Sequence, residues 1–170
     1  MTSLVMGGKS SEMVIQELET ASRIFMSPPS AVTQEQRHQA ENIFLQFRKT
    51  PNPYGMCQSI FMSCSNPQIL FETAALLRDA ILREWSMLSE EQICGLLQVI
   101  LELLAQHVQD WKPFVKEKLM ELLPDVLQET SSKSEANFVE FNQFQIFVLE
   151  RTVMVVPQHG ICLDQFRKLI

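Results

Sequence analysis

Apolar residues recur three or four positions apart along most of the chain, the spacing that places them on one face of an α-helix. Capping residues and prolines interrupt this pattern, and runs of β-branched residues are scarce. The pattern therefore predicts consecutive helices and no sheet. We expect helices from Ser10 or Ser11 to Ser27, from Thr33 through Phe47, from about Tyr54 to Cys64, from Pro67 to about Trp85, from Ser89 through Leu104, from Pro113 through Val126, from Glu135 to about Val155, and from about Leu163 onward.

Several helix ends carry local signals. Thr33-x-x-Gln36 and Ser89-x-x-Gln92 are capping boxes, in which the two side chains satisfy backbone N–H groups that lack helical partners. Asn66-Pro67 pairs a capping residue with proline at the first helical position. The stretch Ser27-Pro28-Pro29-Ser30 should end the first helix, because proline cannot donate a backbone hydrogen bond.

Short links between consecutive helices are typical of antiparallel hairpins packed side by side. The sequence predicts an all-α fold with about three hairpins and part of a fourth. We expect residues 1–9 to form a disordered tail, residues 10–130 to hold the hairpins, and residues 131–170 to add a further helical segment after a polar linker. Because the pattern stops inside an amphipathic helix, we also expect a fragment of a longer array.

Two segments about one repeat apart carry the strongest pattern. The first is Arg37-x-x-Ala40-Glu41-x-x-Phe44-x-x-Phe47, and the second is Ala74-Ala75-x-Leu77-Arg78-Asp79-x-Ile81-x-x-x-Trp85. Ala40 and Ala75 stand 35 residues apart, a separation in the range of helical-repeat arrays. Alanines let helices approach closely and aromatic rings fill the space between layers. We therefore predict that the core includes Ala40, Phe44, Phe47, Ala75, Leu77, Ile81 and Trp85.

Composition narrows the function classes. The net charge of −6 argues against direct nucleic-acid binding, which needs clustered Lys and Arg against phosphates. No apolar run reaches the roughly 18 residues that a membrane helix requires, and no signal peptide is evident. The four cysteines, Cys57, Cys64, Cys94 and Cys162, form no metal-binding spacing, so we expect reduced thiols and no metal site.

Together the two segments resemble the opening repeats of importin-β-type nuclear transport receptors, and the amino-acid sequence around them is similar to that of an exportin. The resemblance is strongest over residues 14–85. It implies HEAT-type hairpins stacked as an α-solenoid, with Arg37, Ala40, Glu41, Phe44 and Phe47 as the first structural signature and Ala75, Leu77, Ile81 and Trp85 as the second. A nuclear export receptor of this kind is not an enzyme, needs no cofactor and shuttles between nucleus and cytoplasm.

The resemblance also implies partners: Ran-GTP, protein cargo and nuclear pore proteins. In this family the second helices of the first repeats contribute to the grip on Ran-GTP, which makes Arg78 and Asp79 the candidate Ran-binding residues. Arg78 and Asp79 stand where the family usually has Lys and Asn. Arg keeps the positive charge but changes the donor geometry, whereas Asp loses an amide donor and adds a negative charge.

Other readings stay open. The main alternative is a helical-repeat scaffold or adaptor that binds protein without Ran dependence, and an enzyme is a third. Glu41 can make a capping or inter-repeat hydrogen bond or contact a partner. Glu117, Glu121 and Asp125 form an acidic stripe that is either a solvated face or a surface for a basic partner. His159 and Cys162 would suit a base and a nucleophile, but no orienting acid accompanies them.

Overall fold

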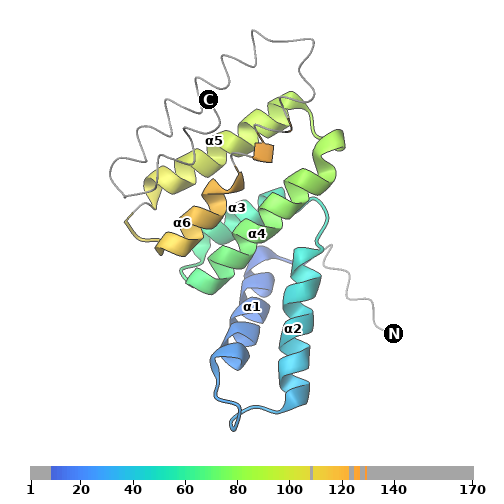
Figure 1. Ribbon diagram of the computed structural model, residues 1–170, viewed down its shortest axis with the longest axis vertical. Coiled ribbons are helices and arrows are strands. Elements are labelled where there is room, and N and C mark those ends of the chain that lie inside the picture. Colours follow the sequence, from blue (N-terminus) through green and yellow to red (C-terminus); the bar gives the residue numbers. More distant parts are fainter. Residues whose placement is uncertain (1–8, 108, 123–124, 127–128, 130–170) are drawn as a thin grey trace. The chain divides into compact units, whose positions relative to one another are not determined.

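The computed structural model describes residues 9–107, 109–122, 125–126 and 129, and the regular elements among these residues are all helices, with no strand (Figure 1). The predicted all-α class is therefore confirmed for this part of the chain. The predictions for residues 1–8 and for the segment 131–170 concern residues outside those described. The helices are α1 (Ser11–Met26), α2 (Gln34–Arg48), α3 (Tyr54–Ser63), α4 (Pro67–Glu84), the 3-10 helix η1 (Trp85–Met87), α5 (Glu90–Gln106) and α6 (Pro113–Met120).

The predicted capping signals begin the helices that they were expected to begin. The Thr33 hydroxyl accepts from the Gln36 N–H while the Gln36 side chain accepts from the Thr33 N–H, and Ser89 and Gln92 repeat this arrangement at α5. Asn66 Oδ1 accepts from the Gln68 N–H, one residue after the proline that opens α4. These bonds satisfy donors in the first turn that have no partner within the helix.

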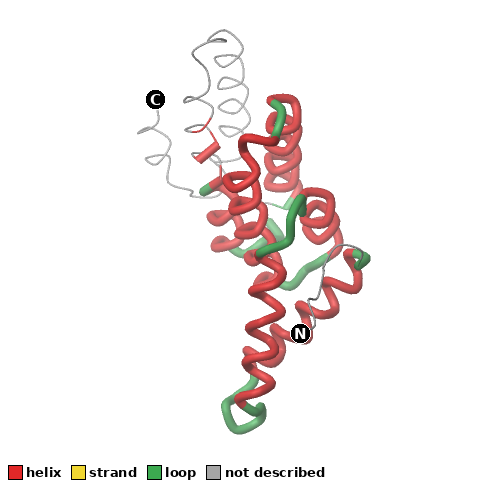
Figure 2. The backbone as a smooth tube through the Cα atoms, turned by 90° about the vertical axis from the view of Figure 1, so that its right-hand side faces the viewer, coloured by secondary structure: helices red, strands yellow, loops and turns green. Residues whose placement is uncertain are grey.

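The described chain falls into two compact units, one ending at Glu84 and the other beginning at Trp85. In the first unit, α1 and α2 run antiparallel along each other, and α3 and α4 form a second pair (Figures 1 and 2). Helix α1 also contacts α3, and α2 contacts α4, so the two pairs pack against each other. Their core is built from large apolar side chains that are almost fully buried: Leu18, Phe47, Ile60, Phe61, Ile69, Leu70, Leu76 and Ile81.

Helix α4 is the most buried helix of the first unit, and it contacts α1, α2 and α3. Three alanines of α4, Ala74, Ala75 and Ala80, are buried. Their side chains are small, so they allow neighbouring helices to approach α4 closely. Cys57 and Cys64 are buried free thiols, as predicted. Burial raises the pKa of Cys57 to about 12 and raises that of Cys64 as well.

The second unit begins with η1 and includes α5 and α6. Helix α5 buries Ile93, Leu97 and Ile100 and exposes polar residues on its other side. The sequence prediction carried the sixth helix through Val126, whereas α6 ends at Met120. Within α6 the Phe114 side chain is 45% exposed, and Val115 and Leu119 are fully buried. Phe114 is the second residue of the helix and lies about 100° around its axis from Val115, so it falls outside the face that Val115 and Leu119 bury.

Candidate functional site

Arg78 and Asp79 lie on the part of α4 that is not packed into the core. Leu77 and Ile81 are 4% and 2% exposed, and Ala80 is fully buried, so these residues form the inward face of the helix. Arg78 is half-buried and Asp79 is exposed. A cation and an anion side by side on an accessible helix surface are able to contact a charged partner, which is the chemistry that the sequence assigned to them.

The apolar members of the two signatures are buried, as predicted. Ala40, Phe44 and Phe47 face inward from α2, and Ala75, Leu77 and Ile81 face inward from α4. Trp85 follows the end of α4 in the 3-10 helix and is 6% exposed. The Arg37 guanidinium donates from Nη2 to the Ser27 carbonyl oxygen at 3.0 Å, which ties the start of α2 to the end of α1.

Among the residues that the structure describes, Glu41 lies beside His38 and makes no capping or inter-repeat hydrogen bond, the first of the two roles that the sequence left open. Its side chain is 55% exposed, and its carboxylate lies 3.9 Å from Nδ1 of His38 on the same helix. The Glu41 position is one helical turn before Leu45, and both residues border a groove on the first unit. Contact between Glu41 and a partner protein stays a prediction.

The groove lies among α1, α2 and α4 and has a volume of about 440 Å³. Its apolar part includes the Phe25–Phe44 pair, whose ring centroids are 5.5 Å apart at an angle of 53°, and Leu45, which is 51% exposed. Its polar part includes an ion pair between Arg48 and Glu72, with 2.7 Å between Nη2 and Oε2. The full lining is Phe25, Glu41, Phe44, Leu45, Arg48, Gln68 and Glu72.

The lining of the groove holds more negative than positive charge, because it includes Glu41 and Glu72 but only one arginine, Arg48. Arg48 already pairs with Glu72, so Glu41 is the carboxylate left to attract a cation. An apolar side chain followed by a lysine or arginine would match this arrangement. Sequence reasoning missed the groove, because its walls come from three helices that are separated by up to 47 residues.

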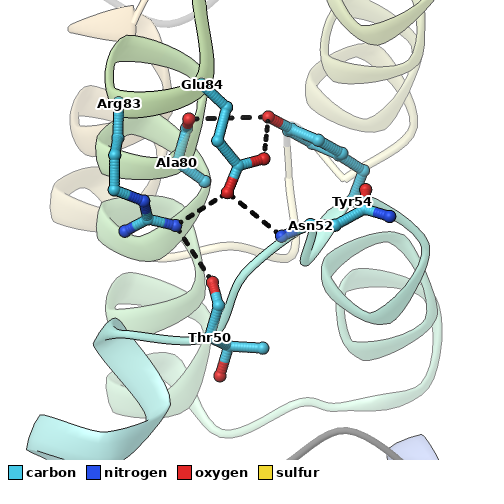
Figure 3. Close-up of polar contacts among 6 residues, drawn as sticks. All are labelled: Thr50, Asn52, Tyr54, Ala80, Arg83 and Glu84. Carbon is cyan, nitrogen blue, oxygen red and sulfur yellow. Dashed lines mark hydrogen bonds and ion pairs between the residues drawn. The ribbon is translucent and has the colours of Figure 1, made fainter. Parts of the chain in front are cut away.

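A second polar cluster ties the α2–α3 loop to the end of α4 (Figure 3). The Glu84 carboxylate, on a residue that is 8% exposed, accepts from the Asn52 N–H at 3.1 Å, the Tyr54 hydroxyl at 2.9 Å and Arg83 Nη2 at 3.0 Å. Arg83 Nη2 also donates to the Thr50 carbonyl oxygen at 3.0 Å. Asn52 adopts a φ of 44°, a left-handed conformation that asparagine tolerates better than most residues.

The electrostatics of this cluster follow from its donors. Burial by itself would raise the pKa of Glu84, but the hydrogen bonds from Asn52, Arg83 and Tyr54 outweigh it and hold this pKa below its usual value. Burial, together with the hydrogen bond to Glu84, raises the pKa of Tyr54. The cluster therefore consists of one carboxylate surrounded by hydrogen-bond donors. We call it the Glu84 clamp, because it holds the α2–α3 loop and Tyr54 against the end of α4. The sequence signal that could have found it is the turn-forming run Pro51-Asn52-Pro53 before an aromatic residue.

The remaining sequence candidates give no additional site. The acidic stripe is partly neutralised, because Glu121 Oε2 lies 2.8 Å from Nζ of Lys118. His159 and Cys162 lie outside the described residues. Within the described part of the chain, no group of three or more His, Cys, Asp or Glu residues could hold a metal ion, and no helix is long and apolar enough to cross a membrane. A comparison of the chain with models of known protein families finds no match.

Proposed function

We propose that the chain is a protein-binding module of HEAT-type hairpins and forms the N-terminal region of a nuclear export receptor that binds Ran-GTP. The support is that the residues which resemble the family's segments are buried or exposed as their roles in that family would require. The apolar residues of both segments are buried in α2, α4 and η1, while the polar pair Arg78–Asp79 stays outside the core. A recognition surface on a stacked-helix protein has this arrangement, with apolar residues holding the helices and polar residues left for the partner.

The mechanism that we propose is thermodynamic linkage. Ran-GTP and export cargo would each stabilise the same curvature of a stacked-helix array, so that each raises the affinity of the other. Small rotations between neighbouring hairpins add along such an array, which makes its curvature easy to change. The receptor would pass the nuclear pore by contacts with pore proteins and shuttle between nucleus and cytoplasm.

The test is the affinity of the 170-residue chain for Ran loaded with a nonhydrolysable GTP analogue and for Ran loaded with GDP. We expect a clear preference for the GTP form. Arg78→Glu should weaken binding to the GTP form by about tenfold or more, because a charged interface contact contributes about 2–5 kcal/mol when it is buried and less at the rim. Thermal unfolding should change little, since Arg78 lies outside the core.

Lys49→Glu is the matched control, because it makes the same change of charge at an exposed position at the end of α2. It should leave the affinity for Ran nearly unchanged if the effect of Arg78→Glu is local. Equal losses in both variants would mean that only the overall charge matters. Equal affinity for GTP-loaded and GDP-loaded Ran, or no binding to either, would refute the receptor proposal.

The second candidate is a helical scaffold that binds protein without Ran dependence. The groove among α1, α2 and α4 favours it, because Leu45, which is 51% exposed, and the half-buried Phe25 offer accessible apolar surface in the groove that Glu41 also lines. A scaffold of this kind would bind segments that combine apolar and basic residues, whatever nucleotide Ran carries. Nucleotide dependence therefore separates the two candidates.

A further inference from the structure

The loop between α1 and α2 holds a serine in a conformation suited to modification. Ser27 follows the last residue of α1 and has φ −76° and ψ 142°, an extended backbone. Pro28 and Pro29 come next, and both prolines, Ser30 and Ala31 are exposed, as is Met26 on the other side, with 81% of its surface accessible. The residue before a proline is driven to this extended region because the helical region clashes with the proline ring.

We propose that Ser27 is a phosphorylation site for a proline-directed Ser/Thr protein kinase and that Arg37 pairs with the phosphate. Such kinases bind their substrates as extended segments with proline directly after the hydroxyl residue, and Ser27-Pro28 offers both features. Ser27 itself is half-buried, and the residues on either side of it, Met26 and Pro28, are exposed. In the reaction the Ser27 Oγ attacks the γ-phosphorus of ATP. The Oγ–P bond forms, the bond to the bridging oxygen breaks, ADP leaves, and the hydroxyl proton passes to the kinase base.

The only other hydroxyl residue followed by proline in the sequence, Thr50 before Pro51, provides an internal comparison. Thr50 is 8% exposed, and its carbonyl oxygen accepts from Arg83 in the cluster around Glu84 (Figure 3). A kinase could reach the Thr50 hydroxyl only after this loop had left the core. The two motifs therefore share the dipeptide pattern and differ in accessibility, so the folded chain should be modified at Ser27 and not at Thr50.

The surroundings of Ser27 contain cations for the new phosphate. Arg37 Nη2 already lies 3.0 Å from the Ser27 carbonyl oxygen, and Arg23 is in the last turn of α1, one turn before Ser27. The Ser27 hydroxyl now donates to the Arg23 carbonyl oxygen at 2.8 Å, and phosphorylation removes that donor. A phosphate at a helix C-terminus is repelled by the helix dipole, so the pairing with arginine decides whether the hairpin tolerates it.

The experiment incubates the folded chain with ATP and a mitogen-activated protein kinase, and locates the phosphate by peptide mass spectrometry. We expect about one phosphate per chain, on Ser27, in the unsubstituted protein and in Ser30→Ala and Thr50→Ala. Ser27→Ala should lose the phosphate, and Ser27→Thr should keep it, provided that circular dichroism shows both variants folded. No incorporation, or a phosphate on Thr50 in the folded chain, would overturn the proposal.

The role of Arg37 is tested by the melting temperature with and without the phosphate. Phosphorylation should lower the melting temperature of Arg37→Gln by about 1–4 °C more than that of the unsubstituted protein, the range expected from loss of an exposed ion pair. Equal shifts would show that Arg37 does not hold the phosphate. Neither measurement involves Ran, so the result is independent of the proposed transport function.

Discussion

The hydrogen bonds around Glu84 predict how much the cluster stabilises the fold. Glu84, Tyr54 and Arg83 should contribute unequally to the free energy of unfolding. Glu84→Gln removes the charge but keeps the shape of the side chain. The carboxylate accepts from Asn52, Tyr54 and Arg83, and only 11% of the Glu84 side chain is exposed. The amide that replaces it offers one acceptor and one donor group, so a donor of the cluster must face another donor or turn away.

The magnitude follows from the kind of bond that is lost. Hydrogen bonds to a charged group contribute about 1.5–3 kcal/mol each, and part of this remains because the amide oxygen still accepts. We therefore expect Glu84→Gln to lower the free energy of unfolding by about 2–3 kcal/mol. Tyr54→Phe removes the hydroxyl that donates to Glu84 at 2.9 Å and, more weakly, to the Ala80 carbonyl oxygen at 3.5 Å, and it should cost about 1–2 kcal/mol. Arg83→Gln should cost about 1 kcal/mol or less, because the Arg83 side chain is 43% exposed and solvent screens its ion pair.

Urea unfolding followed by far-UV circular dichroism at neutral pH measures all three variants. The double variant Glu84→Gln/Tyr54→Phe should cost less than the sum of its parts, since the two residues share a bond. A loss for Arg83→Gln as large as that for Glu84→Gln would refute the reasoning, because the stabilisation would then come from the exposed pair. So would a loss for Glu84→Gln below about 0.5 kcal/mol, the size of an ordinary surface substitution.

The dependence on pH gives a second check on the same group. The pKa of Glu84 is lower in the folded protein than the ordinary value of a glutamate, so the unfolded chain takes up a proton at a higher pH than the folded protein does. The stabilisation is then fully present above that value and is lost as the pH falls through the lower, folded pKa. The difference in stability between the unsubstituted protein and Glu84→Gln should therefore narrow as the pH falls below about 4.5, and a constant difference would contradict the assignment.

Two further predictions concern buried residues. Trp85→Ala should lower the free energy of unfolding by about 3–5 kcal/mol, because the ring is 6% exposed, and an unchanged melting temperature would show that the ring packs against little. Cys57 and Cys64 should react slowly with a thiol reagent in the folded protein, because both are buried and their pKa values are raised, whereas unfolding without reductant should release four reactive thiols. Two or fewer in freshly purified protein would indicate disulfides.

The features that the sequence predicted well are local ones. The capping boxes at Thr33–Gln36 and Ser89–Gln92 join residues three positions apart, so the hydroxyl and amide are always within reach once the helix forms. The buried faces of α2 and α4 likewise follow from a period of 3.6 residues. The pattern was sufficient to predict the burial of Ala40 and Ala75, because a small residue among large apolar ones is typical of a point where two helices approach closely.

The features that the sequence did not predict depend on residues far apart in the chain. Glu84 meets the Asn52 N–H across 32 positions, and nothing in the periodicity of α4 distinguishes Glu84 from a solvated carboxylate. Arg48 and Glu72 pair across 24 positions to form one wall of the groove. These contacts arise from the angle and register at which α4 packs against α2 and from the path of the loop that follows α2, and helical periodicity carries no information about either.

The same distinction decides which residues can identify the function. Any pair of stacked hairpins needs small and aromatic residues at positions such as Ala40, Phe44 and Ile81, so their burial fits a transport receptor and a plain scaffold equally well. Arg78 and Asp79 differ, because they are polar residues outside the apolar core of α4 and a partner can contact them there. If Arg78→Glu changes the affinity for GTP-loaded Ran and Lys49→Glu does not, the pair has a partner that a scaffold would lack. If neither variant changes binding, the groove beside Glu41 becomes the surface where a partner should be sought, and Leu45, apolar and half exposed in its wall, is the residue to substitute first.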